Sequence, residues 1–371
     1  MKNLSLHLIG VMVLTIILQF GTASCKKHSD ETGSSSFNYS KIVFQGSTSM
    51  SQPRYICAGA AIGTKIMFAG GSDGNVTDYS SVEIYETTTN SWSLAQLSHA
   101  RRELSSAVAG GKVFFAGGYG AHGADTTVDI YDGTTGAWTT SSLSAPRGNM
   151  AAATAGNLVV FAGGYYLTYS DIVDIYDLEK KSWKVAHLSV PRDYLAGIGM
   201  GNKIMIMGGE SGPSQYSDVI DIFDVSTGLW SISHLPVTRV DPSVAVSGNK
   251  LFLTGSTGSD SLLSSVEIYD MNTNLWNRSY LSELRGGEMA VSVGNLVLFI
   301  GGVKDSLHFP VVSDVIDIYN LNTGNWSVAH MSTPRYLVTP VVSGNKIFIG
   351  GGLSKLDWSS VTATVDVFTA E

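Results

Sequence analysis

The chain of 371 residues contains only two cysteines, Cys25 and Cys57, so it lacks the cysteine pairs on which a disulfide framework depends. Basic residues are also few: 23 lysines and arginines face 31 aspartates and glutamates, and the net charge is −8. Because no basic stripe offsets this acidity, we do not expect a nucleic acid partner. The sequence also lacks a serine nucleophile elbow, a phosphate-binding loop and an HExxH motif, so we expect no cofactor.

Long apolar runs are scarce too, and the one at residues 4–20 follows Lys2 and precedes Thr22-Ala23-Ser24-Cys25. This pattern resembles a bacterial lipoprotein signal, which implies cleavage before Cys25 and lipidation of Cys25. A run of about 17 residues is at the lower limit for spanning a bilayer, which disfavours an uncleaved transmembrane helix. We therefore expect a signal peptide at 1–24 and a lipidated Cys25 followed by a flexible polar linker, 25–39. An ordinary secretory signal and a secreted protein are the alternative.

What the sequence does contain is repetition, with an arginine nine residues after a tryptophan in each of six copies. The six pairs are Trp92/Arg101, Trp138/Arg147, Trp183/Arg192, Trp230/Arg239, Trp276/Arg285 and Trp326/Arg335. Arg54 opens the series without a preceding tryptophan. A period of 45 to 50 residues indicates a repeat architecture, with repeats that start near 54, 101, 147, 192, 239, 285 and 335.

Each repeat predicts four short strands separated by tight turns. One copy shows an apolar run with a glycine doublet at 112–118, an acidic-aromatic strand at 127–132 and a tryptophan strand at 137–143. Gly-Asn or Gly-Gly pairs lie between the first and second strands, where a two-residue hairpin requires positive φ. A four-stranded meander of this length is one blade of a β-propeller.

Seven glycine doublets mark seven blades. They are Gly70-Gly71, Gly117-Gly118, Gly163-Gly164, Gly208-Gly209, the degraded Gly255-Ser256, Gly301-Gly302 and Gly350-Gly351. The last copy stops before any tryptophan strand, and the run at 40–45 precedes Arg54 without a use in the first copy. We expect this N-terminal run to be the outer strand of the last blade, which leaves no unpaired sheet edge there.

The doublet, the acidic-aromatic strand, the spaced tryptophan and the trailing arginine resemble the kelch repeat, over residues 40–371. This resemblance implies an all-β, seven-bladed kelch propeller with four antiparallel strands per blade. Two departures are the broken doublet Gly255-Ser256 and Gln45, which stands where the closing strand should carry its tryptophan. The six tryptophans are expected to pack between blades, and the Ala, Gly and Ser of the inner strands to fit near a crowded axis.

The arginines should share one face of the propeller and surround the channel mouth: Arg54, Arg101, Arg147, Arg192, Arg239, Arg285 and Arg335. Their mutual repulsion requires negative charge nearby. That charge is supplied either by one acid per blade (Glu83, Asp129, Asp174, Asp221, Glu267, Asp317 and Asp366) or by an anionic ligand held in the arginine fork. Some kelch propellers hold acidic partner segments with arginines at this motif position, so the resemblance keeps both readings open.

Loops between the second and third strands carry aromatic residues beside acids and amides, a combination that suits a sugar or a peptide. The aromatic candidates are Tyr119, Tyr165, Tyr166, Tyr216 and Trp358. The copper radical oxidases with a kelch-type propeller need a tyrosine cross-linked to cysteine and two histidines at one metal. Here His187, His234 and His330 fall on outer strands of three different blades, so we expect no metal site.

Together these features predict a lipid-anchored monomeric propeller on the bacterial cell envelope, at the outer membrane or the periplasmic face. Its expected role is to bind a glycan or an acidic peptide or protein segment at the arginine-lined face, without catalysis. The alternative is a carbohydrate-active enzyme of the sialic acid mutarotase or epimerase type, because such an enzyme also uses a kelch propeller. That chemistry needs only a carboxylate or histidine near a bound sugar.

Overall fold

The computed structural model describes residues 38–371, apart from residue 76, residues 257–263 and residues 307–308. The regular structure in this part of the chain is antiparallel β-sheet, with one short 3₁₀ helix, η2 (Trp358–Ser360). No helix within these residues is long and apolar enough to cross a membrane. The predicted signal peptide, Cys25 and most of the predicted linker lie outside the described residues. The all-β class is confirmed.

Five sheets of four strands repeat the predicted meander. The first three contain β2 (Ala58–Ile62), β3 (Lys65–Ala69), β4 (Ser81–Glu86) and β5 (Ser91–Gln96); β6 (Ser105–Ala109), β7 (Lys112–Ala116), β10 (Thr127–Asp132) and β11 (Trp138–Ser142); and β12 (Ala151–Ala155), β13 (Leu158–Ala162), β16 (Ile172–Asp177) and β17 (Ser182–His187). The other two contain β26 (Met289–Val293), β27 (Leu296–Ile300), β30 (Val315–Asn320) and β31 (Trp326–His330); and β32 (Thr339–Ser343), β33 (Lys346–Gly350), β34 (Thr364–Ala370) and β1 (Ile42–Ser49).

A sixth sheet joins two such meanders through one long strand, β21 (Leu229–Ser247). Its other strands are β18 (Ala196–Met200), β19 (Lys203–Met207), β20 (Ser217–Asp224), β22 (Lys250–Ser256), β23 (Ser265–Asp270) and β24 (Leu275–Tyr280). The first part of β21 pairs with β20 and the remainder with β22. One strand therefore serves as the outer strand of one meander and the inner strand of the next.

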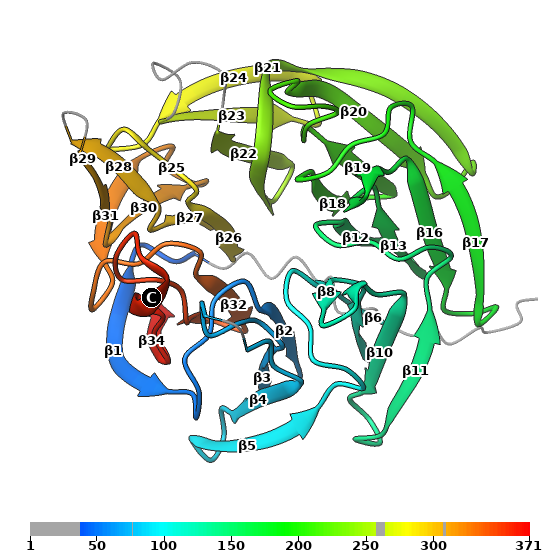
Figure 1. Cartoon of the computed structure of the whole chain (residues 1–371). Helices are drawn as coiled ribbons and strands as arrows, with labels where there is room; N and C mark the ends of the chain where they lie inside the picture. The colour runs from blue at the N-terminus through cyan, green and yellow to red at the C-terminus, as the bar shows by residue number, and fades with distance from the viewer. Residues whose placement is uncertain (1–37, 76, 257–263, 307–308) are drawn as a thin grey trace, which may run out of the picture. The chain divides into compact units, whose positions relative to one another are not determined.

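The innermost strands of these meanders lie around a common centre (Figure 1). They contact one another in the order β2, β6, β12, β18, β21, β26, β32 and back to β2. Crowding at this centre explains their small residues: a Cβ on Gly199 would lie 1.8 Å from the carbonyl oxygen of Thr154 on the neighbouring inner strand. Repeated four-stranded antiparallel sheets in this arrangement are consistent with a kelch-type β-propeller.

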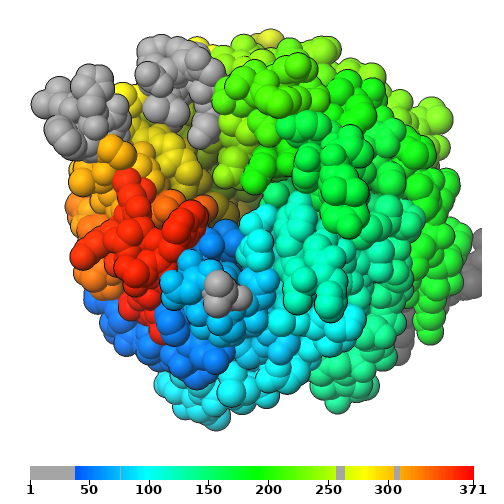
Figure 2. Space-filling view, in the orientation of Figure 1, coloured from blue at the N-terminus to red at the C-terminus, as the bar shows by residue number. Residues whose placement is uncertain are grey.

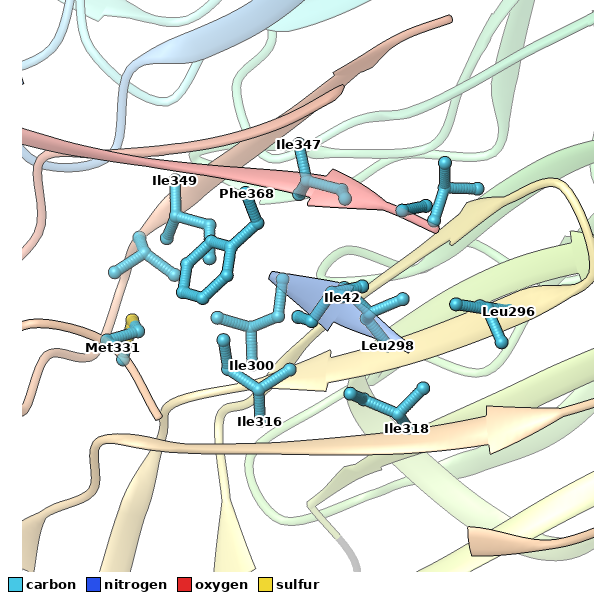
Figure 3. Close-up of a cluster of buried hydrophobic side chains, with 13 residues drawn as sticks. Ile42, Leu296, Leu298, Ile300, Ile316, Ile318, Met331, Ile347, Ile349 and Phe368 are labelled. Atoms are coloured by element: carbon cyan, nitrogen blue, oxygen red, sulfur yellow. The ribbon is translucent and has the colours of Figure 1, made fainter. Parts of the chain in front are cut away.

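The hydrophobic core is divided among the spaces between neighbouring sheets. In the cluster of Figure 3, Ile347, Ile349 and Phe368 face Leu298 and Ile318 of the preceding sheet. Ile42 of β1 lies among them. Each of the other six clusters likewise joins two adjacent four-stranded meanders, and one joins the meander of β32 to that of β2. Burial therefore stabilises contacts between meanders rather than the interior of any one meander.

The N-terminal strand β1 pairs with β34 at the C-terminal end of the chain, as predicted. The register corrects one detail, because Phe44 and not Gln45 stands opposite Phe368, at the position where other sheets place tryptophan opposite tyrosine or phenylalanine. Gln45 is the extra residue of a bulge between Phe44 and Gly46. The Phe44 and Phe368 ring centroids are 5.2 Å apart.

The six tryptophans link neighbouring sheets on the outer side. Each ring packs on the tyrosine or phenylalanine of its own third strand, with centroids 5.0 to 5.2 Å apart. Three indole N–H groups also donate to a hydroxyl on the outer strand of the preceding sheet: Trp92 to Thr48, Trp183 to Ser141 and Trp326 to Ser279. The predicted packing role is therefore found, although the rings are half-buried.

Candidate functional site

The seven repeat arginines are buried, with 0 to 1% of each residue exposed. Each guanidinium forms an ion pair with the acidic residue of its own repeat: Arg54 with Glu83, Arg101 with Asp129, Arg147 with Asp174, Arg192 with Asp221, Arg239 with Glu267, Arg285 with Asp317 and Arg335 with Asp366. In the Arg147 pair the Nη2 to Oδ2 distance is 2.8 Å. Of the two predicted sources of negative charge, the structure has the strand acids.

Six of the arginines also join two glycine doublets. The guanidinium of every arginine donates to the carbonyl oxygen of the first residue of its own doublet, at 2.7 to 3.1 Å. In six of them the arginine carbonyl oxygen also accepts from the second glycine of the preceding doublet, as Arg101 does from Gly71 at 2.9 Å. Gly70 must be glycine, because it has φ +64° and a Cβ there would lie 2.4 Å from the Arg101 oxygen. By this contact the last doublet is Gly351-Gly352, one residue later than predicted.

The acids also accept hydrogen bonds from the backbone. In four repeats their other carboxylate oxygen accepts from the backbone N–H of the serine three residues before the arginine, at 2.9 to 3.1 Å. In the last repeat Asp366 Oδ2 accepts from both Arg335 and the Ser332 N–H, and Oδ1 accepts from the Ser332 hydroxyl. Both carboxylate oxygens are therefore used inside the fold. Because the arginines are buried and paired, a ligand from solvent does not reach them, and the predicted arginine-lined binding face is wrong. The seven arginines instead hold the backbone of neighbouring residues in place, and we call them the frame.

The frame presents one residue of each repeat at the centre of the molecule. The residue two positions after each arginine has a positive φ, between 45° and 70°. These seven residues, which we call the mouth ring, are Ile56, Glu103, Asn149, Tyr194, Asp241, Gly287 and Leu337. Backbone hydrogen bonds join three pairs of successive members, from Glu103 N to Ile56 O at 3.2 Å, from Asn149 N to Glu103 O at 3.4 Å and from Asp241 N to Tyr194 O at 3.0 Å. The backbone repeats, and the side chains all differ.

Six mouth ring residues line a cavity of about 570 Å³, which we call the mouth cavity. Figure 2 shows the corresponding face, which is hollowed near its centre. Below the ring the walls are inner-strand residues such as Gly59, Ser106 and Thr339. Ile56 and Leu337 make one part of the rim apolar, and Glu103, Asn149 and Asp241 make another part polar. Such a mixture is typical of small-molecule sites.

A second cavity of about 420 Å³, the side pocket, adjoins the polar part of the ring. Its lining residues are Arg102, Glu103, Tyr119, Asn149, Tyr165, Tyr169, Asp193, Tyr194 and Glu210. Three of these also line the mouth cavity, so the two spaces share a wall. Four tyrosines and three acids thus meet beside the centre of this face.

Hydrogen bonds hold several side-pocket groups in place. The Tyr119 hydroxyl donates to the carbonyl oxygen of Tyr165 at 2.6 Å, and the Tyr119 ring lies so close to Gly148 that a Cβ there would clash with it. The Tyr169 hydroxyl donates to Oε1 of Glu210 at 3.1 Å. Rings and acids are therefore positioned before any ligand arrives, which lowers the cost of ordering them on binding.

Asp193 is the unusual acid of the side pocket. Only 3% of the residue is exposed, and its Oδ1 atom has no hydrogen-bond partner in the described part of the chain. Burial raises the pKa of Asp193 to about 7, and the negative charge of Glu210 adds to the rise. Burial likewise raises the pKa of Glu103. A buried carboxyl that titrates near neutrality in a cavity marks a candidate functional group.

Only part of the predicted aromatic set is in the site. Tyr119 and Tyr165 line the side pocket, and Trp358 lines the mouth cavity with its ring centroid 5.4 Å from that of Tyr55. Tyr166 and Tyr216 line neither cavity. Cys57 is a buried free thiol in the wall of the mouth cavity, next to the start of β2.

The predicted histidines stay apart. His187, His234 and His330 lie in different repeats, and each Nδ1 is 3.1 or 3.2 Å from an aspartate of its own repeat: Asp171, Asp218 and Asp314. In the described part of the chain, no three His, Cys, Asp or Glu side chains are placed to hold a metal ion.

Sequence reasoning missed the mouth ring and Asp193. Their signal was a fixed spacing, because every ring residue follows its arginine by two and Asp193 follows Arg192 by one. A constant frame with a variable neighbour would have identified these positions. Because the side chains at these positions differ from repeat to repeat, they were overlooked in favour of the repeated glycine, tryptophan and arginine.

Comparison with known proteins shows what the repeats are similar to. Residues 53–96, 191–232 and 238–278 match the family described as Kelch motif. No curated protein sequence matches the chain. Among solved structures, the one described as "Structure of YjhT" is 15% identical with a TM-score of 0.55, and the match covers 86% of this chain and 96% of that one. These findings support kelch repeats on a β-propeller fold, an architecture that generally serves as an interaction module.

Proposed function

We propose that residues 40–371 form a seven-bladed kelch propeller, closed by β1, that acts as a monomeric binding module for a glycan at the mouth cavity and side pocket. The observation that carries this proposal is the mouth ring, in which one backbone conformation holds six different side chains around an open cavity. In a propeller, variable residues at an opening of a constant scaffold determine which ligand is bound. The closed order of inner-strand contacts supports the count of seven blades.

The chemistry of the site favours a sugar over the other expected ligand, an acidic segment. Tyrosine rings offer flat apolar surfaces for a sugar ring, and Asn149, Glu210 and the tyrosine hydroxyls offer partners for sugar hydroxyls. An acidic peptide would meet Glu103, Asp193 and Asp241 instead of the arginines, which are buried. Like charges in a partly enclosed pocket repel strongly.

A glycan array followed by titration calorimetry tests this proposal. Tyr194→Ala should weaken binding of the best glycan about tenfold, because it removes a ring at the wall shared by both cavities. Tyr166→Ala is the matched control, since its exposure of 38% is close to the 41% of Tyr194 and it lines neither cavity. The proposal fails if no glycan binds, or if the two variants have the same effect.

One observation favours a catalytic alternative at the same place. The Asp193 carboxyl, with its pKa raised by burial to about 7, is suited to take and return a proton on a bound sugar. This resembles the requirement of a mutarotase or epimerase, although a sialic acid would bring its own carboxylate into an acid-lined pocket. Proton NMR of sugar anomers with and without the protein tests it, and an unchanged rate of anomer exchange would remove it.

For its location we propose the bacterial cell envelope, with lipid on Cys25 as the membrane anchor. The lipoprotein-like signal of residues 1–25 supports this, and a secreted protein remains the alternative.

A further inference from the structure

We propose that the side pocket binds a protonated amino group, so that the glycan recognised by this face is an amino sugar. The inference rests on the proposed carbohydrate-binding function and adds the chemical class of the ligand. It is carried by the unpartnered carboxylate of Asp193, the charge of the pocket wall and the placement of the tyrosines.

Asp193 supplies the first argument. Its side chain is almost fully buried, yet it lines the side pocket and leaves Oδ1 without a partner among the described residues. A buried polar atom without a hydrogen bond is costly, and a buried ionised one is more so. A ligand ammonium group supplies both a donor and a compensating positive charge. A neutral hydroxyl supplies only the donor.

The charge of the surroundings points the same way. Glu103 and Glu210 line the pocket with Asp193, and the carboxylate of Asp241 acts on Asp193 from the next ring position. The cation in the wall, Arg102, is already engaged: its Nη1 donates to both carboxylate oxygens of Asp78 at 2.9 and 3.1 Å. A further Arg102 contact, Nε to Oε1 of Glu103, is 3.6 Å. The pocket therefore keeps a negative charge for which a cationic ligand is the complement.

The tyrosines distinguish an organic cation from a metal ion. Rings of Tyr119, Tyr165, Tyr169 and Tyr194 surround the acids, and the faces of aromatic rings attract ammonium groups. A metal ion would need several carboxylates converging on one point, and in residues 38–371, gaps aside, no such group of three is present. Acids that are spread among rings suit a larger ligand. A sugar ring with an amino substituent has both the size and the hydroxyls for this wall.

Proton linkage follows from the same groups. Burial and then Glu210 raise the pKa of Asp193 to about 7, so the free protein holds a proton there at mildly acidic pH. An ammonium group favours the ionised carboxylate, and binding should release that proton. Burial also raises the pKa of Tyr119 and of Tyr194, so these phenols stay neutral in this range. For a ligand whose amino group stays protonated over this range, affinity should therefore increase from pH 5.5 to pH 7, by up to about tenfold per pH unit.

The test uses three β-1,4-linked trimers that differ at one substituent: the glucosamine trimer, its fully N-acetylated form and cellotriose. Titration calorimetry of the protein at pH 6.5 should show that the glucosamine trimer binds at least about tenfold more tightly than the other two trimers. Asp193→Asn should remove this preference and the pH dependence. Asp218→Asn, at an exposed acid outside both cavities, should retain them.

A second readout separates a direct role of Asp193 from a structural one. Repeating the titration in two buffers of different ionisation enthalpy should show proton release by the natural protein and none by Asp193→Asn. Equal binding of all three trimers would overturn the inference and leave the carbohydrate function standing. Binding of a lysine-containing peptide in place of the amino sugar would also overturn it. An empty glycan array would remove the proposed function itself.

Discussion

At the scale of single residues, the mouth ring combines backbone strain with chemical variety. Six of its members are not glycine and still adopt positive φ, and for Ile56, which is branched at Cβ, φ of 45° is especially unfavourable. Such a conformation costs of order 1 to 3 kcal/mol and persists only where the surroundings fix it. Here the buried arginine two residues earlier and the ring hydrogen bonds fix it. Strain concentrated around a cavity is typical of functional positions.

Replacing a frame arginine should destabilise the fold. Arg147→Met leaves Asp174 buried and without its cation, so we expect a loss of about 3 to 5 kcal/mol in the free energy of unfolding. Urea denaturation measures it. The double variant Arg147→Met/Asp174→Leu should recover part of the loss, because no charge stays unpaired. Lys180→Met, at an exposed ion pair with Asp177, should leave the midpoint almost unchanged, and an equal effect there would contradict this account.

Asp193 should make stability depend on pH. Its pKa is about 7 in the folded protein and near 3.8 when unperturbed. Between these values the folded protein holds a proton that the unfolded chain has released, so stability should fall as pH rises from about 4 to 7 and then level off. Asp193→Asn should therefore raise the free energy of unfolding at pH 8 by on the order of 2 kcal/mol and change it little at pH 4. Equal gains at both pH values would contradict the assignment.

At the scale of elements, β1 occupies the position that a tryptophan strand holds elsewhere, without a tryptophan. Phe44 packs on Phe368, the bulge at Gln45 follows, and Thr48 accepts the Trp92 indole N–H of the next sheet. β1 thus pairs with the open edge of β34 and continues the series of contacts between the outer strands of neighbouring sheets. An uncovered edge there would invite pairing with other chains.

A disulfide tests this pairing. Val43 and Thr369 stand opposite each other in the register, so Val43→Cys/Thr369→Cys should form a cross-link. Because it closes a loop of more than 300 residues, it should raise the free energy of unfolding by about 2 to 5 kcal/mol. Thermal unfolding with and without reductant measures the gain, and Val43→Cys alone is the control. Failure to cross-link would mean that β1 lies elsewhere.

Sequence patterns predicted the strands well because each strand carries its own local signal. Apolar runs, glycine doublets and the pairing of the chain ends follow from periodicity and composition. Two predictions were wrong by one residue, both where the sequence pattern was ambiguous. Three consecutive glycines at 350–352 allow two different doublets. A bulge at Gln45 shifts the register of β1 by one residue. Strand spacing does not distinguish these possibilities, whereas hydrogen bonds do.

The site was less predictable, because burial is a property of the assembled fold. The burial of the seven arginines could not be predicted from their spacing, because only the packing of adjacent sheets encloses them. The possible pairing with strand acids was foreseen because both recur once per repeat. The side pocket gathers Arg102, Tyr169 and Glu210 from three repeats, and no sequence pattern joins such distant residues.

At the scale of the whole molecule, a lipid on Cys25 would tether the propeller through the segment of residues 26–39. Mass spectrometry of the protein expressed in a bacterial host should find cleavage before Cys25 and diacylglyceryl on its thiol. Cys25→Ala should abolish the lipid and move the protein from the membrane fraction to the soluble fraction. Cys57→Ala is the control, since Cys57 is a buried residue of the fold. Membrane recovery of Cys25→Ala would contradict the anchor.

The double attachment of six of the arginines has a consequence for how the molecule comes apart. The carbonyl of each belongs to the hydrogen bonding of one blade and its guanidinium to that of the next. Open-ended repeat arrays lose units stepwise from their ends, because each unit depends only on its neighbours. Here six of the boundaries are bonded on both sides and the inner strands contact one another in a closed order, so no blade is a free end. Unfolding should therefore be concerted, and new chain termini in any exposed hairpin should yield a circular permutant with the same mouth.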